Sequence, residues 1–193
     1  VRQRLRSLCG LVLGEEQIYL LKRLEPVARA HGFANVSGLL SATLATGRPD
    51  LEAALIESMT THESSFFRDG LFWETLRRTI LPQLAQLNRP IHIWSAACSY
   101  GQEPYSLAMT MVSHFPGLDF EIWATDIAEE TLKRAALGQY SSVEAERGLS
   151  PALLSQFFEP GSDGQVVVKA RLRRSLRFDR YNLLGSAHPL RRF

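Results

Sequence analysis

One glycine and one glutamate have residue types and spacing that suit the binding of a nucleoside cofactor. Gly101 ends a loop of small residues, and Glu103 follows in the first turn of an expected helix. A dinucleotide site would need several glycines in this loop, and a carboxylate here would repel a phosphate. Glu103 instead suits a ligand with a cationic near end, such as S-adenosylmethionine, which carries an ammonium and a sulfonium. The glutamate could equally do no more than complement the helix dipole.

Asp126 is a second acidic candidate, at the end of the next expected strand. An acid about 20–25 residues after such a loop commonly binds the ribose hydroxyls of an adenosine group. Asp126 could otherwise cap the helix that follows, as many strand-ending aspartates do. Taken together with the loop from Gly101 to Glu103, it favours an adenosyl cofactor.

The elements around these residues alternate between strands and helices. Short β-rich runs at 91–94 and 120–124 are each followed by an amphipathic pattern, at 103–114 and 129–137. This order predicts a βαβα unit with a parallel sheet and crossover helices. Residues 181–184 are expected to form a third strand of that sheet.

The first half of the chain predicts helices alone. Apolar residues recur at helical spacing over 15–31, 36–44 and 49–59, and no strand pattern occurs before about residue 90. Two further short strands are expected late in the chain, at 166–168 and 172–178, after a turn cluster at 160–164.

Composition excludes several classes of protein. The 193 residues are 45% hydrophobic and 22% charged, with a formal net charge of +2. These values exclude a disordered, fibrous or disulfide-scaffold protein, and predict no general affinity for nucleic acid or anionic membrane. Cys9 and Cys98 are expected to be reduced thiols, Cys98 as a small buried filler. With no apolar run of about 18 residues, a cytoplasmic protein without membrane insertion is expected. The scattered histidines lack metal-ligand spacing, so no metal site is expected.

Five segments, in order along the chain, resemble the signature motifs of chemotaxis-type protein-glutamate methyltransferases, the CheR family. They are MTTHESSFFR at 59–68, WSAACSYGQEPYS at 94–106, ATDI at 124–127, GQY at 138–140 and NLL at 182–184. The resemblance implies an α/β fold, in which a small all-α N-terminal domain precedes a Rossmann-like class I methyltransferase domain with an inserted small β-subdomain. The expected boundaries are 1–59 for the helical, substrate-docking domain, 60–90 for a linker and leading helix, and 91–193 for the α/β domain. The inserted β-hairpin is expected at about 160–178.

The resemblance also implies an activity and a set of site residues. The expected reaction is methyl transfer from S-adenosylmethionine to glutamate side chains of a protein, giving S-adenosylhomocysteine. The expected substrate is a chemoreceptor, methylated on its cytoplasmic helices. Arg68 is expected near the reacting atoms as the catalytic residue. His62 stands where the family usually has asparagine. It could form a hydrogen bond in the pocket, or it could be a turn residue that faces solvent. The expected cofactor-binding residues are His62, Ser64, Arg68, Gly101, Glu103, Asp126, Asn182 and Leu183. Gly101 is included because of the loop described above.

Two features concern what surrounds this site. The family's Cys-Arg-Asn-Val motif does not occur before Phe193, so the catalytic domain is expected to be truncated at its C-terminus. The turn at 160–164 is shorter than in family members that bind a receptor tail, which predicts docking through the N-terminal helices without that tail. The alternative explanation is that the length of this surface loop has drifted, because surface turns tolerate insertions and deletions.

Two other functions remain open from the sequence. The chain could be a regulatory module that binds S-adenosylmethionine without transferring methyl. A nucleic-acid methyltransferase gains some support from the basic residues of 169–193, although no aromatic stacking platform is interleaved with them. A solvated strand face is the commoner explanation of such a charge run.

Overall fold

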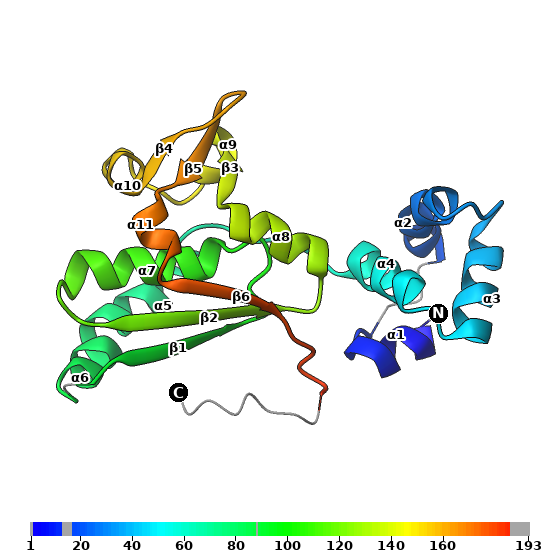
Figure 1. The fold of residues 1–193 in the computed structure, drawn as a ribbon, viewed down its shortest axis with the longest axis horizontal. Helices are drawn as coiled ribbons and strands as arrows, with labels where there is room; N and C mark the ends of the chain where they lie inside the picture. The colour runs from blue at the N-terminus through cyan, green and yellow to red at the C-terminus, as the bar shows by residue number, and fades with distance from the viewer. Residues whose placement is uncertain (1, 13–16, 88, 186–193) are drawn as a thin grey trace. The chain divides into compact units, whose positions relative to one another are not determined.

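This computed structural model of the protein describes residues 2–12, 17–87 and 89–185. Their contacts divide them into two compact units (Figure 1). Of the described residues, the first unit comprises those up to Thr61, 127–130 and 181–185. The second unit comprises 62–126 and 131–180. None of the helices in the described part of the chain has the length and hydrophobicity of a membrane span.

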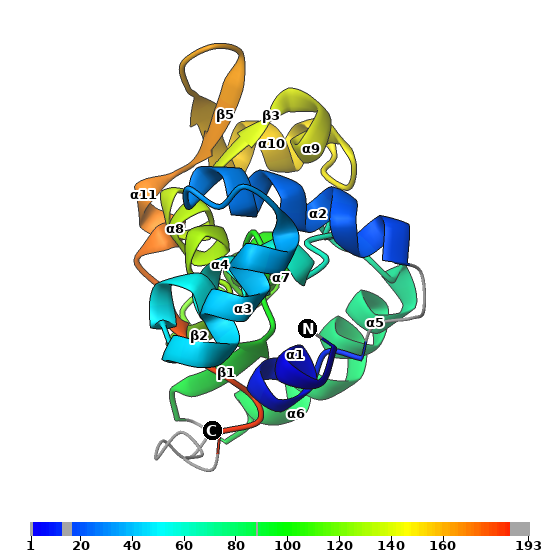
Figure 2. The same ribbon diagram turned by 90° about the vertical axis from the view of Figure 1, so that its right-hand side faces the viewer.

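The first unit is built on four helices, drawn in blue to cyan in Figure 2: α1 (Arg2–Cys9), α2 (Gln17–Ala30), α3 (Val36–Thr46) and α4 (Pro49–Met59). Asn35 caps the start of α3 by accepting a hydrogen bond from the Gly38 amide at 2.9 Å. Helix α4 contacts the other three, and its Leu51, Leu55 and Met59 are buried in the shared core. The all-helical prediction for this part of the chain is confirmed over the described residues. Helix α1 was not predicted, and residues 13–16 at the expected start of α2 lie outside the described residues.

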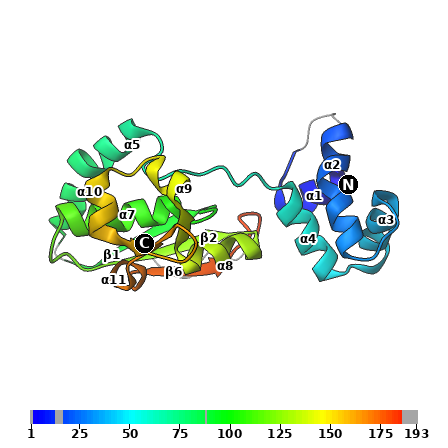
Figure 3. The same cartoon turned by 90° about the horizontal axis from the view of Figure 1, so that it is seen from above.

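The second unit is a parallel sheet with helices packed on it. A helical segment comes first, made of α5 (Gly70–Thr75), η1 (Leu76–Ile80, in π-helical geometry) and α6 (Leu81–Ala85). Then follow β1 (Ile91–Ala96), α7 (Gln102–His114), β2 (Phe120–Asp126) and α8 (Glu129–Leu137). The strands lie in the order β1-β2-β6, all parallel, as the βαβα pattern predicts. Helix α7 runs alongside the sheet and contacts β2 and β6 (Figure 3). The α/β, Rossmann-like prediction is confirmed.

The third strand of this sheet is not at 181–184 as expected. It is β6 (Leu176–Arg180), with Phe178 paired to Ala124 of β2. Leu176 and Phe178 alternate with charged residues and pack on the main core, which stabilises the strand at this register. Leu183 and Leu184 are apolar, but they are 57% and 58% exposed, so no core holds them in a sheet.

The small antiparallel sheet also differs from the expected hairpin at 160–178. Its strands are β3 (Gln139–Ser141), β4 (Phe158–Pro160) and β5 (Gln165–Val168), in the order β3-β5-β4. Short helices join its parts, namely α9 (Ser142–Glu146), α10 (Pro151–Phe157) and α11 (Ala170–Arg173). Part of the run from Leu172 to Phe178, expected as a strand, is therefore helical, because buried Leu172 closes a helical turn from α11 onto α7.

Candidate functional site

The loop between β1 and α7 is held in place by hydrogen bonds from its backbone amides to the end of β2. Ala97 and Ser99 have φ values of 60° and 51°, and Gly101 begins α7 at φ 89°. The Cys98 amide donates to the Thr125 carbonyl at 2.8 Å, and the Ser99 amide donates to the Asp126 carboxylate at 2.9 Å. Asp126, 8% exposed, therefore anchors the loop.

Glu103 stands at the start of α7 with its side chain exposed beside this loop. One carboxylate oxygen accepts a hydrogen bond from the Ser95 hydroxyl at 2.6 Å, which orients the group. The first turn of a helix carries partial positive charge, so an acidic side chain is a favourable residue at this position. Glu103 can thus present a fixed negative charge to a ligand.

The segment 62–69 is anchored through its aromatic residues. Phe66 is 1% exposed and lies edge-on to Tyr140, with ring centroids 4.9 Å apart. The Phe67 amide donates to the Ser106 hydroxyl at 3.1 Å, and the Trp73 indole donates to the Arg68 carbonyl at 2.6 Å. These contacts fix the backbone around Arg68, whose guanidinium stays exposed and donates to the Glu63 carbonyl at 3.3 Å.

Two pockets border this segment. The one beside the β1–α7 loop, here the loop pocket, has a volume of about 350 Å³. The one beside α9, here the α9 pocket, has a volume of about 330 Å³. The loop pocket is lined by Glu63, Ser64, Ser65, Arg68, Asp69, Phe72, Trp73, Ala97, Cys98, Ser99 and Glu103. The α9 pocket is lined by His62, Glu63, Ser64, Ser65, Arg68, Tyr100, Gln102, Glu144 and Arg147. Arg68 borders both.

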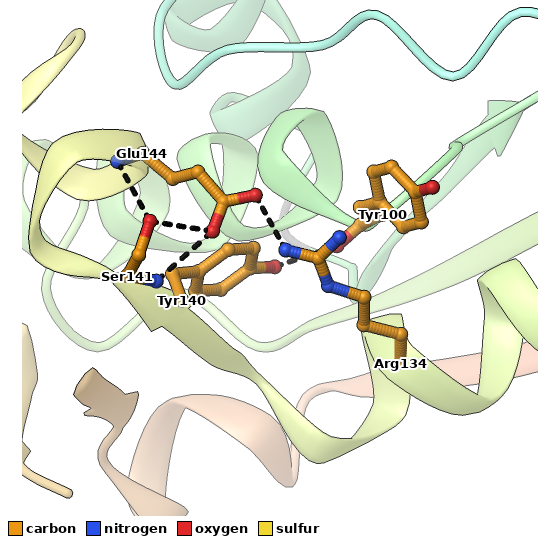
Figure 4. Close-up of polar contacts among 5 residues, drawn as sticks. All are labelled: Tyr100, Arg134, Tyr140, Ser141 and Glu144. Atoms are coloured by element: carbon orange, nitrogen blue, oxygen red, sulfur yellow. Dashed lines mark hydrogen bonds and ion pairs between the residues drawn. The ribbon is translucent and has the colours of Figure 1, made fainter. Parts of the chain in front are cut away.

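A polar cluster supports the wall of the α9 pocket (Figure 4). The Glu144 carboxylate accepts from the Ser141 amide and hydroxyl at 2.9 and 2.8 Å and pairs with Arg134. Burial alone would raise the pKa of Glu144, but the Ser141 hydrogen bonds and the Arg134 charge outweigh it and lower that pKa. Arg134 also lies over the Tyr100 ring, 4.2 Å from its centroid, and Tyr140 donates to the Tyr100 carbonyl at 2.7 Å.

The loop pocket fits a small polar ligand with a cationic end. The Ser99 hydroxyl oxygen is buried without a hydrogen-bond partner, so it is available to a bound molecule. Glu103 offers the negative charge that an ammonium or sulfonium needs, and the pocket volume falls in the usual range for small-molecule sites. These features suit S-adenosylmethionine.

The expected site residues fall into two groups. His62, Ser64, Arg68, Gly101, Glu103 and Asp126 all belong to the second unit and lie in or beside the 62–69 segment and the β1–α7 loop. The His62 ring packs near Tyr100, 5.4 Å between centroids, and a ring nitrogen lies 3.3 Å from the Thr131 hydroxyl. Asn182 and Leu183 belong to the first unit, where the Asn182 amide donates to the Leu8 carbonyl at 2.7 Å. Their assignment to the cofactor stays a prediction.

Sequence reasoning gave no role to three residues that line the α9 pocket. Gln102 lies within the motif at 94–106, between Gly101 and Glu103, but the sequence indicated no role for it. Glu144 and Arg147 follow β3 and carry no motif, so only the fold places them beside Arg68. Cys98 is 2% exposed, and burial together with Asp126 raises the pKa of its thiol well above the usual range. The prediction that Cys98 is buried is confirmed.

Comparison with known families decides the classification. Residues 62–193 match the family model described as CheR methyltransferase, SAM binding domain. The chain belongs to the CheR methyltransferase family.

Similarity to proteins named chemotaxis protein methyltransferases extends through the helical unit as well. The chain is 40% identical over 188 residues to the chemotaxis protein methyltransferase of Vibrio parahaemolyticus, covering 94% of this chain and 68% of that protein. It is 40% identical over 195 residues to chemotaxis protein methyltransferase 1 of Vibrio cholerae, with 98% and 71% covered. Chemotaxis protein methyltransferase 1 of Pseudomonas aeruginosa is 36% identical over 199 residues, with 98% and 72% covered.

Proposed function

We propose that this CheR-family chain transfers the methyl group of S-adenosylmethionine to glutamate side chains of a chemoreceptor, giving glutamate methyl esters and S-adenosylhomocysteine. Membership of a S-adenosylmethionine-binding methyltransferase family supports the reaction type. The names of the relatives, chemotaxis protein methyltransferases, support a protein substrate of chemotaxis. The observation that carries the proposal is the position of Arg68, which borders both the loop pocket and the α9 pocket.

The main task of the protein in this reaction is to align the carboxylate with the methyl group. A glutamate carboxylate has an ordinary pKa of about 4.3, so it is ionised near neutral pH and needs no general base. When bound, S-adenosylmethionine supplies an electrophilic methyl on a positively charged sulfur. The transfer would exchange a carbon–sulfur bond for an oxygen–carbon bond, with the electron pair left on sulfur, and would leave no proton for a side chain to move. The enzyme must hold the carboxylate in line at near-attack distance and remove its water.

Each expected site residue then has a defined task toward the cofactor or the substrate. Glu103 binds the cationic end of the cofactor, and the Ser99 hydroxyl gains the partner that it lacks. Asp126 binds the ribose hydroxyls, while Arg68 orients the reacting carboxylate and takes no part in proton transfer. We assign Ser64, Gly101 and His62 to the surrounding wall, and Asn182 and Leu183 to the adenine end.

The partner and the place of the reaction belong to the same proposal. We expect the cytoplasmic helices of the receptor to dock on the N-terminal helices, without need of a receptor tail. This places the reaction in the cytoplasm, with neither nucleic acid nor a membrane as a binding partner.

Loss of Arg68 tests the reaction directly. In the protein at its natural length, Arg68→Ala is expected to lower the rate of tritiated-methyl transfer to receptor membranes by about two or more orders of magnitude, because the carboxylate loses its orienting charge. Arg78→Ala is the matched control, since Arg78 is an exposed arginine of the same unit that pairs with Glu74. RNA and DNA are offered as substrates in parallel.

The outcomes separate the alternatives. Unchanged transfer by Arg68→Ala rules out the role given to Arg68. Binding of S-adenosylhomocysteine without transfer by the wild type supports the non-catalytic regulatory module. Transfer to RNA or DNA in place of receptor supports the nucleic-acid class.

A further inference from the structure

Arg147 is a cation at the α9 pocket that the reaction as described above does not use. It directly follows α9, and its side chain is exposed on the pocket wall. No hydrogen bond or ion pair from its guanidinium occurs within the part of the chain that the structure describes. A guanidinium group that lies at a pocket and pairs with no protein group can bind a carboxylate ligand through two parallel N–H donors.

The other charges at this pocket leave Arg147 available. They come from Glu63, Arg68 and Glu144, with His62 also on the wall. Both Glu144 oxygens are engaged, one by Arg134 and one by Ser141, so Glu144 does not neutralise Arg147 (Figure 4). The Glu63 side chain is exposed, and its contact with Arg68 is through the backbone carbonyl. The pocket therefore offers two guanidinium groups against one uncompensated carboxylate.

Gln102 supplies an independent sign of a ligand. Its side chain is 2% exposed, it lines the α9 pocket, and its Oε1 atom is buried without a hydrogen-bond partner. A buried amide left unsatisfied costs stability, so such groups normally have partners. Half a turn about the last side-chain bond exchanges the amide oxygen and nitrogen, so Gln102 can donate to a carboxylate.

Arg147 is also held in position by its neighbour. A Cβ atom built on Gly148 would lie 2.0 Å from the Phe66 carbonyl oxygen, so only glycine allows the backbone to pass this close. Phe66 is two residues before Arg68 and is buried in the core. The contact ties the end of α9 to the segment that carries Arg68.

We propose that the α9 pocket receives the substrate glutamate and that Arg147 binds its carboxylate, which makes Arg147 a determinant of specificity for glutamate over glutamine. This inference rests on the proposed function. One carboxylate oxygen is held by Arg147, with Gln102 as a second donor, while the other faces Arg68 and the loop pocket.

The same arrangement favours release of the product. The second oxygen forms the bond to the methyl carbon, the carbon–sulfur bond breaks, and the sulfur keeps the electron pair. The ester is neutral, so its attraction to Arg147 falls once the transfer is complete. A glutamine side chain, also neutral, is disfavoured in the pocket for the same reason.

Steady-state kinetics of Arg147 variants test the proposal. Methyl transfer is measured against concentration of a receptor cytoplasmic fragment, and the Kd of S-adenosylhomocysteine is measured by calorimetry. Arg147→Ala is expected to raise KM for the fragment by about tenfold or more, with kcat changed less than about threefold, because a charge-assisted hydrogen bond to substrate is lost. Arg147→Lys is expected to raise KM for the fragment less than Arg147→Ala does, because lysine keeps the positive charge. The Kd of S-adenosylhomocysteine stays unchanged in both variants.

Arg89→Ala is the matched control. Arg89 is an exposed arginine of the same unit, before β1 and so at the opposite end of the strand from the β1–α7 loop. A KM shift in Arg147→Ala no larger than that of Arg89→Ala overturns the proposal, and so does an increased Kd for S-adenosylhomocysteine, which would assign Arg147 to the cofactor. Absence of transfer by the wild type is a different result, because it overturns the proposed function itself.

Discussion

Asp126 illustrates how one residue serves the site in two ways. Its carboxylate accepts a hydrogen bond from the Ser99 amide. This bond helps to hold the β1–α7 loop in a conformation with positive φ at Ala97 and Ser99. The same residue is the one we assign to the ribose hydroxyls. A carboxylate has several acceptor positions, so the two tasks do not compete.

Substitution of Asp126 is expected to weaken binding of the cofactor and of its product. Asp126→Ala removes a charged acceptor from the ribose, and the affinity for S-adenosylhomocysteine should fall by about 1–3 kcal/mol by calorimetry. Asp126→Asn keeps a side-chain oxygen that can accept the hydrogen bond from the Ser99 amide. Its affinity for S-adenosylhomocysteine should therefore fall less than that of Asp126→Ala. Wild-type affinity in a folded Asp126→Ala protein would contradict the assignment.

At the scale of elements, α9 is positioned by both of its ends. At its start, Ser141 and Glu144 form a reciprocal capping box. At its end, Gly148 packs directly on the Phe66 carbonyl. A helix of only five residues, Ser142–Glu146, has little stability alone, so these end contacts determine where it lies.

Substitution of Gly148 tests this packing. Gly148→Ala places a methyl group where the Phe66 carbonyl lies, so the free energy of unfolding in urea should fall by about 1–3 kcal/mol or more. Gly70→Ala is the control, because a Cβ there meets nothing within 4 Å and Gly70 lies at the start of α5. Equal stability of the two variants would show that the backbone at Gly148 moves aside without cost.

At the scale of the whole molecule, the question is which surface holds the receptor. The β4–β5 connection turns within a few residues, with φ values of 53° at Asp163 and 72° at Gly164. The Gly161 amide donates to the Gln165 carbonyl at 2.9 Å, which closes the turn tightly. A peptide strand added to the edge of this small sheet would find a short platform.

We therefore expect weak or no binding of receptor C-terminal peptides. Titration of such peptides against the protein at its natural length should give no micromolar complex, and methyl transfer to a receptor lacking its tail should remain close to that of the intact receptor. Micromolar binding that is lost on substitution within residues 160–178 would show that the short turn still serves as a docking platform.

Elements whose signals are local can be predicted from the amino-acid sequence. Local patterns predicted helices α2 to α4, the strands β1 and β2, and the acidic residues that end or follow these strands, because apolar periodicity and loop chemistry depend on neighbours in the chain. They did not predict helix α1. The resemblance carried by the motifs at 59–68 and 94–106 predicted the family correctly.

Contacts between residues that are distant in the chain became known from the folded structure alone. The third strand lies at 176–180 because Leu176 and Phe178 reach the core, whereas the apolar residues at 181–184 do not enter a strand. Arg147 and Gln102 share a pocket with Arg68 because Gly148 packs on Phe66 and the β1–α7 loop is anchored on β2. Such contacts join residues far apart in sequence, and no local pattern encodes them.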